Sequence, residues 1–157
     1  MGGGAVHVFL AASGFAGART VDDADWTVVP PETLGGGALG RALAVADFDG
    51  DGVLDIAMGA PEAFPSVGFV GAVYVAFGSE LGPLLTLDVD DAWRGESSGD
   101  EAGSSLAVVD TDGPGAQLAV SALGVDGVTF NAGAVYIIDP TTTPMCTRCP
   151  TASNALR

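Results

Sequence analysis

The chain has 157 residues, 48% of them hydrophobic, and a formal net charge of −15, because twenty acidic residues outnumber five cationic ones. This hydrophobic content excludes a wholly disordered chain. The negative charge opposes a nucleic acid or an anionic membrane as a partner and favours cations. Twenty-four glycines and nine prolines disfavour long helices. The composition therefore predicts an all-β fold of short strands joined by turns.

The two ends of the sequence carry few signals. No hydrophobic run reaches the roughly 18 residues that a spanning helix needs, so direct membrane insertion is not expected. The residues after Met1 lack the basic segment of a secretory signal, and Val6 stands where a myristoylation motif has Ser or Thr. Cys146 and Cys149 lie in a Pro/Thr-rich tail, where half a zinc site, a disulfide and two free thiols all remain open.

The first predicted strand begins at Gly4 and contains His7, the only histidine. A lone histidine in a strand gives little support to a catalytic triad. Residues 35–40 then match the dinucleotide fingerprint G-x-G-x-x-G. Pro30 and Pro31 interrupt the strand that should lead into this motif, and too few residues follow it for the required helix. A flexible loop between strands is predicted there.

The next segment is the most informative of the chain. Asp47, Asp49, Asp51 and Asp55 occupy positions 1, 3, 5 and 9 of a glycine-containing loop. Four carboxylates this close repel one another unless a divalent cation lies among them, and oxygen ligands favour Ca²⁺. The backbone carbonyl of Val53 can supply the ligand at position 7. The loop therefore predicts a calcium site with these five residues as its ligands.

The residues after the loop indicate which elements hold it. An EF-hand needs a glutamate at position 12, where this chain has Met58. Residues 56–61 are typical of a short buried strand that ends at Gly and Pro, so a loop between two strands is predicted. Asp47 and Asp49 also resemble the first motif of haloacid-dehalogenase-type phosphatases, as nucleophile and general acid with Mg²⁺. Against this alternative, Asp51 interrupts that motif and the chain has no lysine for the phosphate.

Similar segments recur along the chain. Gly4-Ala5-Val6 returns as Gly71-Ala72-Val73 and as Gly133-Ala134-Val135, at steps of 67 and 62 residues, and Trp26 returns as Trp93. Each period holds about four predicted strands, which in the central unit are residues 42–48, 54–59, 71–77 and 86–89. Four-stranded antiparallel sheets repeated at a fixed period are typical of a β-propeller. We therefore expect a partial propeller of about two and a half blades, with open ends that expose apolar faces.

The repeats also resemble a known family. Leu39-Gly40, the loop at residues 47–55, Gly59-Ala60-Pro61 and Gly71-Ala72-Val73-Tyr74 are similar to the FG-GAP repeats of integrin α-subunit propellers and their microbial relatives. Leu39 replaces the family's Phe. The resemblance covers residues 1–139, with a partial blade at 1–33, a full blade at 34–95 and a partial blade at 96–139. Residues 140–157 are the tail.

The second loop, at residues 110–117, departs from the calcium pattern. Pro114 replaces the third carboxylate and Gln117 stands where the closing aspartate would be, so weak or no calcium binding is predicted there.

The resemblance implies a calcium-binding module for protein binding, adhesion or scaffolding, outside the cell or at its surface, and no enzyme. Its partners would be a protein ligand or further propeller blades. The segment could be a truncated product, a piece of a longer protein or a unit that closes by oligomerising. The family also includes the non-catalytic propeller of secreted hydrolases such as glycosylphosphatidylinositol-specific phospholipase D.

Overall fold

The computed structural model describes residues 4–13, 17–31, 37–64, 68–88, 91–109, 115–126 and 130–142. The predicted all-β class is confirmed: these residues form strands and turns and no α-helix. Three short 3-10 segments lie wholly within the described ranges: η1 (Ala11–Ser13), η2 (Val21–Asp23) and η5 (Gly78–Glu80). None of the helical segments in this part of the chain has the length and hydrophobicity to cross a membrane. Cys146, Cys149 and residues 110–114 lie outside the described residues.

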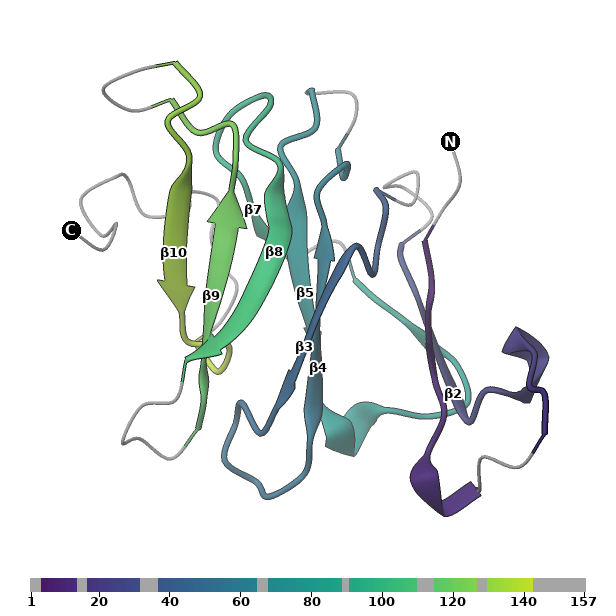
Figure 1. The fold of residues 1–157 in the computed structure, drawn as a ribbon. Coiled ribbons are helices and arrows are strands. Elements are labelled where there is room, and N and C mark those ends of the chain that lie inside the picture. Colours follow the sequence, from purple (N-terminus) through teal and green to yellow (C-terminus); the bar gives the residue numbers. More distant parts are fainter. Residues whose placement is uncertain are drawn as a thin grey trace.

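The strands form three sheets that lie side by side (Figure 1). The first sheet has the order β1-β2-β6, the central sheet β3-β4-β5-β7 and the third sheet β10-β9-β8. All pairings are antiparallel except that of β2 with β6. The bounds are β1 Val6–Val8, β2 Trp26–Val29, β3 Ala42–Ala46, β4 Asp55–Ala60, β5 Ala72–Ala76, β6 Leu85–Thr86, β7 Trp93–Arg94, β8 Ala102–Val109, β9 Gln117–Ala122 and β10 Ala134–Ile138.

The central sheet is covered on both faces, because alternate side chains of its strands point into two separate cores. Met58 and Tyr74 belong to the first core, which also contains Val28 of the first sheet. Ala57 belongs to the second core, which also contains Leu118 of the third sheet. Every residue of β4 is consequently buried. Such double coverage explains why this strand reads as a continuous apolar run.

Close backbone contacts join the central sheet to the third. Gly71 forms an isolated parallel bridge with Ala102, and a side chain at Gly71 would collide with the backbone of Ala102. Gly103 has a φ of +87° and would, with a side chain, meet Val73 and the backbone around Gly59. Only glycine combines this φ with such a close approach. The paired glycines therefore set the spacing between the two sheets.

The first and central sheets meet through the equivalent residues one repeat earlier. A side chain at Gly4 would collide with the backbone of Leu39, and Gly40, with a φ of +86°, lies against Val6. Leu39 and Gly40 precede Ala102 and Gly103 by one repeat. The repeat seen in sequence is thus also a repeat of the sheet-to-sheet contact.

The fourth strand of the central sheet differs from the prediction at residues 86–89. β7 occupies this place and pairs with β5, as β2 pairs with β1 in the first sheet. Of the predicted segment, Thr86 instead lies in β6, which pairs with β2 of the first sheet. The reason is burial: the side chain of Leu87 lies in the first core.

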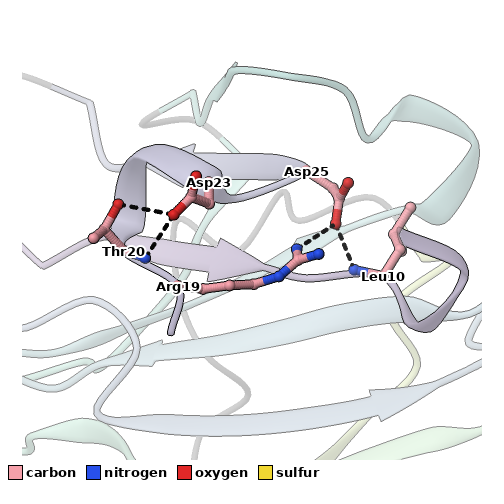
Figure 2. Close-up of polar contacts among 5 residues, drawn as sticks. All are labelled: Leu10, Arg19, Thr20, Asp23 and Asp25. Atoms are coloured by element: carbon pink, nitrogen blue, oxygen red, sulfur yellow. Dashed lines mark hydrogen bonds and ion pairs between the residues drawn. The ribbon is translucent and has the colours of Figure 1, made fainter. Parts of the chain in front are cut away.

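Aspartates organise the long connection between β1 and β2 (Figure 2). The Oδ2 atom of Asp23 accepts hydrogen bonds from the backbone N–H of Thr20 at 2.8 Å and from its hydroxyl at 3.1 Å, and these bonds lower the pKa of Asp23. The Oδ2 atom of Asp25 accepts the N–H of Leu10 at 2.7 Å and lies 4.0 Å from Arg19. Part of the acidic excess therefore has a structural role in this connection.

His7 and Tyr74 occupy equivalent positions in successive repeats, and both lie in strands. His7 contacts the hydroxyl of Thr27 across β1 and β2 at 3.1 Å, in agreement with a structural role. Tyr74 is 1% exposed, and its hydroxyl has no hydrogen-bond partner among the described residues. Burial raises the pKa of Tyr74 to about 12; Arg94 opposes the shift and Asp88 adds to it.

We expect Tyr74→Phe to leave stability at neutral pH unchanged or to raise it by up to about 1 kcal/mol, because the variant removes a buried hydroxyl without a partner. The pKa of Tyr74 in the folded protein exceeds the ordinary tyrosine value of 10.0. Tyr74 therefore contributes stability that is complete below the unfolded pKa and is lost as the pH rises from about 10 to about 12. Urea unfolding at neutral pH and near pH 11 should show a smaller alkaline loss in the variant. An equal loss in both proteins would contradict this assignment.

Candidate metal centre

The aspartate loop joins two antiparallel strands, as predicted. β3 ends at Ala46, which pairs with Asp55 at the start of β4. The chain reverses between them through Gly50 and Gly52, whose φ angles are +78° and +86°, values that glycine adopts without strain. The hairpin brings the first and last aspartates of the loop to the same end of the sheet.

Three carboxylates converge in this hairpin. One oxygen each of Asp47, Asp49 and Asp55 can be chosen so that all three lie within 4.8 Å of one another. Calcium binds oxygen at 2.3–2.6 Å, so two oxygens on opposite sides of one ion are about 5 Å apart. The separation and the all-oxygen chemistry of these side chains therefore suit a calcium ion.

Backbone N–H groups of the loop hold the carboxylates in place. Asp47 accepts the N–H of Gly50 at 2.7 Å and that of Gly52 at 2.9 Å, one on each oxygen. Asp49 accepts the N–H of Asp51 at 3.0 Å. These bonds offset part of the repulsion between the carboxylates and fix their direction. The loop is therefore ordered by its own hydrogen bonds around the three converging oxygens.

Asp55 has a further role that the sequence did not reveal. Its side chain is fully buried. Its Oδ2 atom accepts the N–H of Phe48 at 2.7 Å, and its Oδ1 atom accepts the N–H of Gly78 at 2.8 Å. The second bond ties the loop to η5, which follows β5. No local motif indicates this contact, because Gly78 lies 23 residues further along the chain.

The pKa of Asp49 reports the mutual repulsion in the loop. The largest single influence, the hydrogen bond from Asp51, lowers this pKa. Desolvation and the negative charges of Asp51, Asp55 and Asp47 together outweigh it and raise the pKa above 3.8. A cation at this position would relieve the repulsion.

Of the two other predicted ligands, one is the carboxylate of Asp51 and the other is the backbone carbonyl of Val53. The carboxylate of Asp51 is outside the group of three and accepts the N–H of Val53 at 2.7 Å. The side chain of Val53 is exposed. Metal ligation by Asp51 and by the carbonyl of Val53 stays a prediction.

The described end of the second loop, residues 115–117, contacts the first loop. Residues 110–114 are outside the described part, but Ala116 donates its N–H to the carbonyl of Asp47 at 3.0 Å. Gln117 begins β9 as Asp55 begins β4. This placement agrees with the comparison of the two loops, in which Gln117 takes the position of Asp55. Whether the second loop binds calcium stays a prediction.

The hairpin does not favour the two enzyme-like alternatives. Asp47 follows a strand whose next partner is antiparallel, whereas phosphatases of the haloacid-dehalogenase type are α/β proteins. Gly40 leads into β3, whereas a dinucleotide fingerprint leads into a helix. Residues 35 and 36 of that fingerprint lie outside the described residues.

Comparison with known proteins agrees with this local architecture. Three of the curated relatives are phosphatidylinositol-glycan-specific phospholipases D. The human protein is 44% identical over 63 residues, the bovine protein 51% over 63 and the rat protein 38% over 89. These matches cover 36%, 36% and 50% of this chain but only 8%, 8% and 9% of the relatives. The chain therefore spans less than a tenth of their length.

A family model gives the clearest assignment. The FG-GAP repeat model matches residues 39–76, a segment that begins at the Leu39-Gly40 pair and ends with β5. It includes β3, the aspartate hairpin and β4. Residues 39–76 of this chain are therefore an FG-GAP repeat.

Proposed function

We propose that this chain is a calcium-binding part of an FG-GAP β-propeller and works as a non-catalytic module for binding proteins. The observation that carries this proposal is the convergence of Asp47, Asp49 and Asp55 in a hairpin of the FG-GAP repeat. The net charge of −15 also favours a cation.

The propeller architecture is supported by the stacking of the sheets. The glycine contacts between the first and central sheets recur between the central and third sheets, as expected when each sheet is one blade. The proposed blades are residues 1–33, 34–95 and 96–139. Propellers close with four to eight blades, so we propose that further blades complete the ring.

In this proposal Asp47, Asp49 and Asp55 hold the ion, and Asp51 and the Val53 carbonyl complete the shell. Bound calcium would neutralise the carboxylates and cross-link the ends of β3 and β4. With an affinity of about 10⁻⁴ M and about 1 mM calcium, mass action adds on the order of 1.4 kcal/mol to the free energy of unfolding. The site would therefore stabilise the fold and perform no reaction.

We expect millimolar calcium to give binding heat and to raise the urea midpoint. Asp49→Asn should abolish both effects while the apo protein keeps its fold, because Asp49 is exposed. Isothermal titration calorimetry and urea unfolding with calcium or chelator measure this.

Asp22→Asn is the matched control, since Asp22 is also exposed but lies outside the loop. It should keep the calcium response. If Asp49→Asn binds calcium as well as the parent, or if the parent gives no heat, the proposed site is wrong.

A second candidate follows from the relatives, which are named as phospholipases D specific for phosphatidylinositol-glycan. In this proposal the chain is part of the propeller of such a secreted hydrolase, and catalysis belongs to another domain. The adhesion candidate instead places it at the cell surface. The sequence of the full reading frame on both sides of this segment distinguishes the two candidates. If it encodes further blades and no catalytic domain, adhesion is favoured. If it encodes a metal-dependent catalytic domain, the hydrolase is favoured.

A further inference from the structure

The 3-10 segment η5 lies directly against the end of the aspartate loop. The N–H of Gly78, the first residue of η5, donates to the Oδ1 atom of Asp55 at 2.8 Å. A side chain at Gly78 would collide with the carbonyl oxygen of Leu54 and with the side chain of Val53. Val53, Leu54 and Asp55 are positions 7, 8 and 9 of the loop. One residue of η5 therefore contacts the part of the loop that carries its last two predicted ligands.

This contact holds the closing carboxylate from outside the loop. The hydrogen bonds described above for Asp47 and Asp49 come from N–H groups of the loop itself. Asp55 is held differently, because the N–H of Phe48 bonds one of its oxygens and the N–H of Gly78 bonds the other. Its side chain is also fully buried. The direction of this carboxylate therefore depends on the position of η5.

η5 is itself fixed on both sides. Phe77, directly before it, packs against the second core. Leu81, directly after it, packs against the first core. The N–H of Glu80 donates to the carbonyl of Phe77 at 2.9 Å and that of Leu81 to the carbonyl of Gly78 at 3.4 Å. The segment can therefore act as a firm support for the loop.

The third sheet offers an internal comparison, because both partners of the contact are replaced there. Gln117 takes the position of Asp55. Pro140 follows Gly78 by 62 residues, which is the step between these two repeats. Proline has no backbone N–H to donate. The acceptor and the donor are thus replaced together, in the repeat whose loop departs from the calcium pattern.

The structure supports this pairing of the two turns. The N–H of Glu80 bonds the carbonyl of Phe77 at 2.9 Å, and the N–H of Thr142 bonds the carbonyl of Asp139 at 3.1 Å. Both bonds span three residues, and each turn follows the strand that pairs with the second strand of its hairpin. The chain therefore makes the same turn in both repeats, with glycine in one and proline in the other.

We propose that Gly78 is a positioning residue of the calcium site: η5 directs Asp55 toward the ion, and bound calcium in turn holds η5 on the loop. This inference rests on the proposed calcium site and adds to it an element outside the hairpin. Without an ion, Asp47 and Asp49 repel the carboxylate of Asp55, whereas a cation attracts all three to one point. Linkage makes the effect reciprocal, so calcium stabilises the docking of η5 by as much as η5 strengthens calcium binding.

Gly78→Ala tests the effect of η5 on calcium binding. The added carbon would push η5 away from Leu54 and weaken the bond to Asp55. We expect the calcium affinity of the full chain, measured by isothermal titration calorimetry, to fall at least about fivefold. Gly82→Ala is the matched control. Gly82 lies in the same connection, but an added carbon there would have no atom within 4 Å, so this variant should keep the affinity of the parent.

A second control separates positioning from a general loss of stability. Gly103→Ala would disturb the contact with Val73 and Gly59, at the end of β4 away from Asp55. Where it is folded, this variant should bind calcium as tightly as the parent. If Gly78→Ala weakens binding no more than Gly103→Ala does, the positioning role of Gly78 is wrong.

Amide hydrogen exchange tests the reverse effect in the parent and needs no variant. If calcium leaves whenever η5 leaves the loop, the N–H of Gly78 should exchange about tenfold more slowly at about 1 mM calcium, for an affinity of about 10⁻⁴ M. The N–H of Thr20 is the control, because it also bonds an aspartate oxygen, that of Asp23, and should be unchanged. Unchanged exchange at Gly78 overturns the proposal even if Gly78→Ala does not fold.

These results distinguish the role of η5 from the metal site itself. If the parent gives calcium heat but Gly78→Ala and Gly82→Ala bind calcium equally well, only the role of η5 is wrong. If the parent gives no calcium heat, the metal site is wrong and this inference fails with it.

Discussion

Replacement of Asp55 by Ala is expected to lower the free energy of unfolding by about 2–4 kcal/mol, even with calcium removed. The variant leaves the buried N–H of Phe48 and the partly buried N–H of Gly78 without their acceptor. Each unsatisfied buried donor costs about 1–3 kcal/mol. Urea unfolding in the presence of a chelator measures the loss. The same variant should also lose any calcium response, so it cannot test the metal site by itself.

Asp49→Asn is the comparison that separates the two roles of the loop. Asp49 is exposed and accepts a hydrogen bond from within the loop, so its replacement should change apo stability by less than about 1 kcal/mol. If Asp55→Ala is no more destabilising than Asp49→Asn without calcium, the structural role given to the two Asp55 bonds is wrong.

Replacement of Gly103 by Ala should cost about 2–5 kcal/mol. The φ of +87° strains any residue with a side chain, by about 1–2 kcal/mol. The added carbon would also meet the carbonyl oxygen of Ala72 at 2.5 Å, Val73 at 3.0 Å and the Cα atom of Gly59 at 3.1 Å. Overpacking of this kind costs about 1–3 kcal/mol. The urea midpoint measures the sum.

Gly99→Ala provides the control for backbone strain alone. Gly99 has the same φ of +87°, but an added carbon there would have no atom within 4 Å. The difference between the two variants therefore reports the contact between the central and third sheets. Equal losses would show that this contact tolerates a side chain, and the glycine pairs would not set the sheet spacing.

The aspartate hairpin was predictable from the sequence, whereas the fourth strand of the central sheet was not. The hairpin around Asp47 was predictable because its ligand spacing, its glycines and its flanking strands are all local in sequence. The strand at residues 86–89 was placed wrongly, although Trp93 had already been matched to Trp26. Apolar residues such as Leu87 are compatible with either sheet, and only packing decides which one they join.

The sequence by itself determined the all-β class, the repeat and the acidic hairpin of an FG-GAP repeat, because each depends on residues within one short window or at one fixed step. The tertiary structure alone decided three other features: the anchoring of Asp55 to Gly78, the pairing of β6 with β2, and the burial of Leu87 in the first core. These arise between segments distant in the chain. Their energies depend on which surfaces remain uncovered once the sheets have stacked, and no local pattern records that.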